Sequence, residues 1–165
     1  MTPPSAIVTG GTRGIGLAIA HQLCNRGFSV SICGRSESGL ATALETLRQA
    51  YPNTTLHGAS VDVTNSESVN DYVKSVSHDL GDPYCLINNA GITQDQLIMR
   101  MTPESSDAVI QTFLCAAFSF TKSVIRGMLK QKSGRIIMIG SVIGSTGNAG
   151  QANYAASQAG LIGLC

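Results

Sequence analysis

The sequence predicts a doubly wound α/β domain, in which helices cover both faces of a parallel β-sheet. Three observations support this fold class. Five short apolar runs lack polar–apolar alternation, which is typical of strands buried on both faces. A stretch with apolar residues at helical spacing follows each run. Hydrophobic residues make up 43% of the chain and charged residues 13%, so we expect one domain, residues 1–165, with a sizeable core.

The elements alternate along the chain. Strands are predicted at residues 5–9, 28–33, 55–61, 84–88 and 135–141. Turn and cap residues mark the helices between them: Gly27 ends the first, and Pro52 follows the second. Thr102 as cap and Pro103 at the first helical position begin a long fourth helix that runs to about residue 132. A fifth helix begins near residue 153.

Composition argues against several classes of function. Eleven basic and ten acidic residues leave a net charge of +1, which gives no excess for binding nucleic acid or an anionic membrane. The three histidines lie far apart, so we expect no metal site. Five cysteines without a CxxC pair indicate a reducing compartment, the cytoplasm or the mitochondrial matrix. Four residues precede the first apolar run, so we expect no targeting segment.

The segment between the first strand and the first helix is rich in glycine. It reads Thr9-Gly10-Gly11-Thr12-Arg13-Gly14-Ile15-Gly16. Glycines allow a tight turn, a close approach of the backbone to a ligand and close packing of the helix on the strand. Free N–H groups at a helix start favour an anion. The loop therefore predicts a phosphate site; the alternative is a loop whose glycines serve packing alone.

The spacing Gly-x-x-x-Gly-x-Gly resembles that of the short-chain dehydrogenase/reductase family, which has a Rossmann-type sheet. Three further motifs match in order: Asn88-Asn89-Ala90-Gly91, Gly140-Ser141, and Tyr154 thirteen residues after Ser141. Within the family, the chain is most similar to β-ketoacyl-acyl-carrier-protein reductases and carbonyl reductases. The resemblance covers the first two thirds of the family's chain. We therefore expect a C-terminally truncated form in which the last two strands of the family's sheet are missing.

The resemblance implies a nicotinamide dinucleotide as cofactor. In this fold, an acidic residue after the second strand favours NAD, whereas a basic one accepts the 2′-phosphate of NADP(H). Arg35 stands there and Arg13 lies in the glycine loop, which favours NADP(H). Glu37 lies nearby and complicates this interpretation. The alternative is that both arginines are simply solvated side chains on loops. The family's motifs imply these cofactor-binding residues: Gly10, Thr12, Arg13, Gly14, Ile15, Gly16, Arg35, Ser36, Asp62, Val63, Asn88, Ala90, Gly91, Tyr154 and Gln158.

The resemblance also assigns Tyr154 as a catalytic proton donor and Ser141 as the residue that orients a carbonyl. The family has a lysine four residues after the tyrosine, and its charge makes the tyrosine a better acid at neutral pH. This sequence has Gln158 there. The family's helix-borne asparagine, which helps hold a water that links the lysine to solvent, corresponds to Phe113. The lysine and the asparagine form the two ends of a relay through that water in the family, and both are replaced in this sequence.

The resemblance implies NADPH-dependent reduction of a ketone. The expected substrate is a small molecule or a carrier-bound acyl group, such as a 3-oxoacyl thioester reduced to a 3-hydroxyacyl thioester in fatty-acid synthesis. Because of Gln158 and Phe113, a catalytically impaired or inactive cofactor-binding subunit is the alternative, and a truncated isoform without stable activity is another. Relatives form homo-oligomers through the helices at 103–132 and 153–165, and the second of these is shortened here.

Overall fold

The computed structural model describes residues 3–165 and confirms the parallel α/β sheet. Within these residues the strands form one sheet in the order β3-β2-β1-β4-β5. The strands are β1 (Ser5–Thr9), β2 (Ser29–Gly34), β3 (Leu56–Ser60), β4 (Cys85–Asn88) and β5 (Arg135–Met138). The helices are α1 (Gly14–Asn25), α2 (Glu37–Ala50), α3 (Ser66–Leu80), α4 (Pro103–Ile110), α5 (Ala116–Gln131), α6 (Ile143–Thr146) and α7 (Ala152–Leu164), and a π-helical turn, η1 (Gln111–Cys115), lies between α4 and α5.

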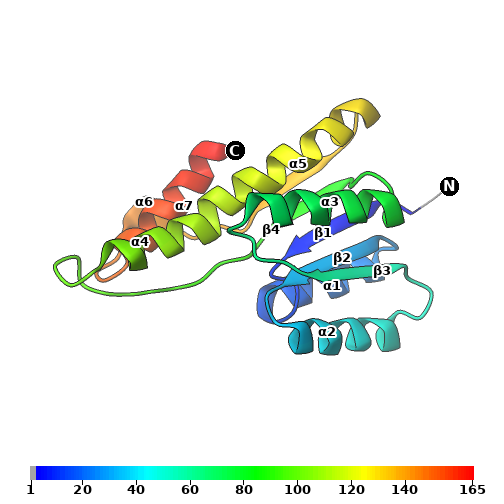
Figure 1. Cartoon of the computed structure of the whole chain (residues 1–165), viewed down its shortest axis with the longest axis horizontal. Helices are drawn as coiled ribbons and strands as arrows, with labels where there is room; N and C mark the ends of the chain where they lie inside the picture. Colours follow the sequence, from blue (N-terminus) through cyan, green and yellow to red (C-terminus); the bar gives the residue numbers. More distant parts are fainter. Residues whose placement is uncertain (1–2) are drawn as a thin grey trace.

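The sheet separates two hydrophobic cores. In β1, Ile7 belongs to the core shared with α3 and α5, whereas Ala6 and Val8 belong to the core shared with α1 and α2. Figure 1 shows these two helix layers on opposite sides of the sheet. The central strands therefore read as unbroken apolar runs because neither of their faces meets water.

The starts of the helices differ in how their backbone N–H groups are satisfied. The side chains of Ser36, Asn65 and Thr102 accept hydrogen bonds from the first turns of α2, α3 and α4. Thr102 with Pro103 is the helix start that the sequence predicts. At α1 the N-cap residue is Arg13, and its side chain makes no capping hydrogen bond. The first N–H groups of α1 are therefore left free for another acceptor.

The fourth predicted helix is one continuous stretch, Pro103–Gln131, built from α4, η1 and α5. Among the described residues, this stretch alone is long and apolar enough to cross a membrane by length and composition, and 33% of its most apolar window is buried. Within the domain, α5 packs on α3 and β4, and α4 packs on α7 (Figure 1). One side of this stretch therefore packs against the rest of the domain. The sequence did not predict the π-turn, because one wide turn barely disturbs the helical spacing.

The fifth strand is shorter than predicted. Its pairing with β4 ends at Asn88↔Met138, because β4 itself ends there, so β5 stops at Met138 rather than at residue 141. Ser141 consequently lies in the connection to α6, a short helix that the sequence did not predict. In the described chain β5 is an edge strand, and Ile137 is 45% exposed.

Candidate active site

The glycine loop joins β1 to α1 at the carboxyl edge of the sheet. Gly10 and Gly14 have left-handed φ angles of +63° and +55°, which side chains with a Cβ rarely adopt. Gly16 serves a different purpose: a Cβ there would lie 2.3 Å from the carbonyl oxygen of Gly10. Two glycines thus shape the turn, and the third lets α1 pack on it.

A groove of about 690 Å³ runs along this loop. Most of the predicted cofactor-binding residues line it, namely Gly10, Thr12, Arg13, Gly14, Ile15, Gly16, Arg35, Ser36, Val63, Ala90 and Gly91. The uncapped N-terminus of α1 begins at Gly14 in the same groove. Free backbone donors and the positive end of the helix dipole are suited to a phosphate. The residues present therefore fit the pyrophosphate of a dinucleotide.

Two arginines give the groove its charge. Arg13 and Arg35 both line it and are exposed, whereas Glu37 does not line it. Ser36 has a structural task as well, since its hydroxyl accepts from the Gly39 N–H at 3.1 Å and caps α2. The groove therefore offers guanidinium groups at the place where a ribose phosphate would be recognised.

Asp62 lies beside the groove and is not among its lining residues. Its carboxylate accepts from the backbone N–H and the hydroxyl of Thr64, at 3.0 and 2.7 Å. These hydrogen bonds, with a smaller contribution from the charge of Arg35, lower the pKa of Asp62. The side chain is thus engaged in a local turn, and its contact with a cofactor stays a prediction.

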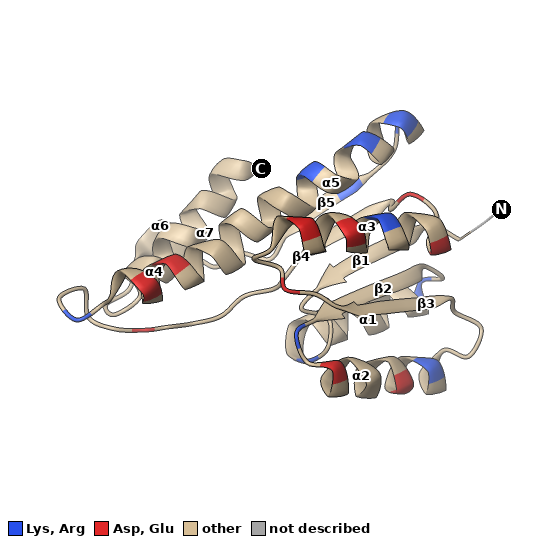
Figure 2. Ribbon diagram, viewed as in Figure 1, with Lys and Arg blue, Asp and Glu red and all other residues tan. Residues whose placement is uncertain are grey.

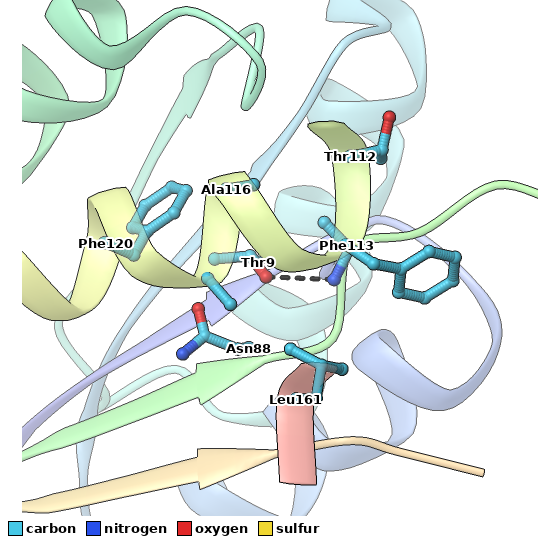
Figure 3. A pocket seen from close by; sticks show the side chains of 9 residues that line it. Thr9, Asn88, Thr112, Phe113, Ala116, Phe120 and Leu161 are labelled. Atoms are coloured by element: carbon cyan, nitrogen blue, oxygen red, sulfur yellow. Dashed lines mark hydrogen bonds between the residues drawn. The ribbon is translucent and has the colours of Figure 1, made fainter. Parts of the chain in front are cut away.

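Asn88 is also placed differently from the rest of its motif. It is buried, its amide nitrogen lies 3.2 Å from the sulfur of Met138, and its amide oxygen has no partner among the described residues. It faces a small internal cavity of about 10 Å³ that Thr9 and Phe120 also line (Figure 3). The side chain of Asn88 therefore points into the core, and its cofactor contact stays a prediction.

Asn89 is the residue that the sequence analysis missed. Its amide nitrogen donates to the carbonyl oxygens of Thr9 and Gly10, at 2.9 and 3.2 Å, and so ties the end of β4 to the glycine loop. Thr9 completes the link, because its hydroxyl accepts from the N–H groups of Asn89 and Ala90, both at 2.9 Å. The doubled asparagine was the available signal. The groove also has these lining residues that were not predicted: Gly34, Gly39, Val61, Asn89, Ile92 and Thr112.

A second cleft, of about 510 Å³, continues the groove towards α7. The groove and the cleft share these lining residues: Arg13, Ile15, Asn89, Gly91 and Ile92. Tyr154 lines the cleft together with Phe113 and Gly140. Ser141 follows Gly140, and its hydroxyl oxygen accepts from the Ile143 N–H at 3.3 Å, which leaves the O–H free to donate. The structure thus places Tyr154 in the cleft that adjoins the groove, and Ser141 follows Gly140 at the edge of that cleft.

Gln158 does not line either space. It is 1% exposed, and neither atom of its amide has a hydrogen-bond partner in the described chain. Its oxygen lies 3.6 Å from the position that a Cβ on Gly140 would occupy, so the side chain is turned into the packing beneath β5 and α6. Its role in binding a cofactor stays a prediction. No group of three metal-ligating side chains occurs within residues 3–165.

These features define a class of protein: a doubly wound domain with a groove that fits a dinucleotide at the switch in strand order, and a tyrosine in the adjoining cleft. Comparison with known proteins makes the class specific. The model of the short chain dehydrogenase family matches residues 4–165, and the chain therefore belongs to that family.

Individual relatives agree with the family. The chain is 47% identical over 159 residues to the 3-oxoacyl-acyl-carrier-protein reductase FabG of Vibrio cholerae, covering 96% of this chain and 63% of the relative. Identity to the Escherichia coli FabG is 45% with the same coverage. A crystal structure of an actinorhodin polyketide ketoreductase variant with NADPH superposes with a TM-score of 0.95 at 36% identity, covering 99% of this chain and 64% of the other. The chain thus spans about 63% of the length of the curated relatives it matches.

Proposed function

We propose that this chain forms the coenzyme-binding and catalytic part of an NADPH-dependent ketone reductase. The observation that carries the proposal is the continuity of the groove with the cleft, which share five lining residues. A dinucleotide with its pyrophosphate on the glycine loop would extend its other end towards Tyr154. A family tyrosine at that end is suited to protonating an oxygen of a substrate.

The preference for NADPH over NADH rests on Arg13 and Arg35. Both guanidinium groups line the groove, and an additional phosphate on the adenosine ribose would give them a partner. The ketoreductase of similar fold was crystallised with NADPH, which supports this choice. Asp62 and Glu37, the nearby carboxylates, are not among the residues that line the groove.

The proposed reaction uses two hydroxyl groups. A bound reduced nicotinamide would supply a hydride to the carbonyl carbon. Tyr154 would donate the proton that the developing alkoxide needs, and Ser141 would donate a hydrogen bond that orients the carbonyl oxygen. The names of the FabG relatives favour a 3-oxoacyl group on an acyl-carrier protein as substrate. These relatives come from bacteria, which supports the cytoplasm over the mitochondrial matrix.

A second candidate function is supported by one specific observation. The position of the family's lysine carries the buried, unpartnered amide of Gln158, and no charged residue occurs on α7 (Figure 2). A neutral amide cannot stabilise a tyrosinate by charge. Loss of effective acid–base catalysis costs on the order of 10²–10⁴ in rate. The alternative is therefore a chain that binds NADPH but turns substrate over slowly, as an impaired subunit would.

One experiment tests both candidates. NADPH binding is measured by coenzyme fluorescence, and turnover by absorbance at the nicotinamide band with an acetoacetyl thioester, for the wild type, Gln158→Lys and Tyr154→Phe. We expect all three proteins to bind NADPH. The turnover rate should be low in the wild type and about 10²-fold higher in Gln158→Lys, and it should not rise in Tyr154→Phe. Absence of NADPH binding by the folded wild-type chain would overturn the reductase proposal. Fast wild-type turnover that Gln158→Lys does not raise would overturn the impaired alternative.

A further inference from the structure

Phe113 is presented to the cleft by the one π-helical turn of the described chain. It is the middle residue of η1, within a stretch that is otherwise α-helical. π-Turns are rare and recur at functional sites, because the extra residue changes which side chains face a ligand. Here Thr112 is 9% exposed and its hydroxyl donates to the Ala108 carbonyl oxygen at 2.7 Å, while Phe113 lines the cleft beside Tyr154. Phe113 also borders the small internal cavity that Thr9 and Asn88 line, and Figure 3 shows its ring extending outward from that cavity.

The ring of Phe113 rests on the backbone of Gly91. A Cβ at residue 91 would lie 2.0 Å from the Cζ atom of the ring and 2.1 Å from Cε1. The φ angle of Gly91 is not left-handed, so the backbone conformation does not require glycine there. In this chain the missing side chain at residue 91 instead leaves the space that the ring occupies. The end of β4 thus fixes the position of the ring.

The same ring contacts Tyr154. The two ring centroids are 5.4 Å apart and the ring planes meet at 82°, which is the edge-to-face arrangement that aromatic pairs favour. Among the described residues, no hydrogen bond holds the Tyr154 hydroxyl. The Gln158 amide, one helical turn further along α7, is buried and unpartnered and therefore does not reach it. Packing, and not a polar contact, sets the orientation of the Tyr154 ring.

We propose that Phe113 is a positioning residue that holds Tyr154 in the cleft by aromatic packing, with Gly91 as its support. The polar groups that the family resemblance implies beside the tyrosine are replaced here by a ring that has no hydrogen-bond donor or acceptor. Tyr154 is thereby held as a lining residue of the cleft, and its hydroxyl is kept free for a substrate oxygen. The catalytic meaning of this arrangement rests on the proposed reductase function, whereas the packing arrangement itself does not.

The packing is tested by NMR of protein labelled with ¹³C-tyrosine. The chain has four tyrosines, and Tyr154→Phe assigns the Tyr154 ring signal by its loss. Phe113→Leu removes the ring, Gly91→Ala displaces it, and Phe113→Tyr restores an aromatic ring. Phe118→Leu is the matched control, because Phe118 is 54% exposed and does not line the cleft.

We expect the Tyr154 signal to shift in Phe113→Leu and Gly91→Ala, to stay near its wild-type position in Phe113→Tyr, and to be unchanged in Phe118→Leu. Should Phe113→Leu fail to fold, Phe113→Met fills a similar volume and answers the same question. An unmoved Tyr154 signal in a folded variant without the ring would overturn the proposal.

The positioning role has a kinetic readout that separates it from the proposed function. In the Gln158→Lys background, Phe113→Leu is expected to lower kcat about tenfold while the KM for NADPH stays within twofold, since Phe113 acts on the tyrosine and not on the coenzyme. Equal kcat values with and without the ring would overturn the positioning role. If no variant binds NADPH, the reductase proposal fails, and the NMR shifts still decide whether Phe113 holds Tyr154.

Discussion

The side-chain amide of Asn89 occupies the space beside Gly16, so that a Cβ on Gly16 would lie 2.5 Å from the amide nitrogen. The same nitrogen donates to the Gly10 carbonyl oxygen at 3.2 Å. One asparagine at the end of β4 thus fixes both ends of the glycine loop. The shape of the proposed phosphate site therefore depends on a residue that need not touch the phosphate.

Substitution Gly16→Ala tests this packing. The added methyl group would lie 2.3 Å from the Gly10 carbonyl oxygen, a backbone atom that cannot move aside without deforming the loop. We expect a loss of about 1–3 kcal/mol in the free energy of unfolding and at least a tenfold loss of NADPH affinity. Urea denaturation and coenzyme fluorescence measure the two effects.

Gly163→Ala is the matched control for that substitution. Gly163 also lies within a helix, α7, and nothing lies within 4 Å of the position of its Cβ. Alanine there should stabilise by up to about 1 kcal/mol, because glycine is a poor helix former. Equal stability and NADPH affinity in Gly16→Ala and the wild type would show that the loop has another packing than the one described.

The glycine loop and its groove followed from the sequence because they depend on local features. The spacing of Gly10, Gly14 and Gly16 between an apolar run and a helix predicts the turn. The position of Arg35 at the edge of the sheet could be predicted because it comes directly after a strand. The fold class followed from the unbroken apolar runs for the same reason. Each of these inferences needs only neighbours along the chain.

What could not be predicted depends on contacts between distant segments. The hydrogen bonds from Asn89 to Thr9 and Gly10 join residues about eighty positions apart. The end of β5 at Met138 depends on the length of its partner β4. The inward direction of Gln158 depends on how α7 packs beneath α6. No spacing rule along one sequence contains this information.

Arg35→Ala is expected to weaken NADPH binding about tenfold or more and to leave NADH binding nearly unchanged. A hydrogen bond to a charged group contributes about 1.5–3 kcal/mol, and NADH lacks the phosphate that would receive it. Arg48→Ala, on the exposed end of α2, is the control, because Arg48 does not line the groove. The measurement is the dissociation constant of each coenzyme at one fixed salt concentration. Equal losses of affinity for NADPH and NADH would argue against recognition of the 2′-phosphate by Arg35.

A buried polar network crosses from the sheet to α3. The hydroxyl of Ser31, on β2, pairs with the hydroxyl of Tyr72, on α3, and lies 2.8 Å from Nδ1 of His57, on β3. On its other side, Nε2 of His57 lies 3.6 Å from the carboxylate of Asp79. Burial lowers the pKa of His57, and the charge of Asp79 opposes this shift without cancelling it. At neutral pH the imidazole is therefore neutral in the folded chain.

This network predicts a loss of stability in mild acid. Because the pKa of His57 is lower in the folded chain than its ordinary value of 6.5, the unfolded chain binds the proton more readily, and stability falls as the pH drops below about 6.5. The carboxylates of Asp62 and Asp79 have lowered pKa values too, and so lose their contribution only below about 3.8. Urea denaturation at pH 7.5 and 5.5 should show a smaller acid loss in His57→Gln than in the wild type. Identical losses in both proteins would assign the effect to another group.

Gln158→Met is expected to make the chain more stable. Methionine has nearly the shape of glutamine and no amide, and an unpaired buried polar group costs about 1–3 kcal/mol, so removing it should raise the free energy of unfolding by about 1 kcal/mol or more. Gln22→Met, at an exposed position on α1, is the control and should change stability little. The same variant decides the role of the side chain at the coenzyme. Since the amide lies outside the groove, NADPH affinity should stay at the wild-type value. A fall in affinity in a variant that has gained stability would mean that the amide turns towards the ribose when the coenzyme binds, and a loss of stability would mean that the amide has a partner in the free chain.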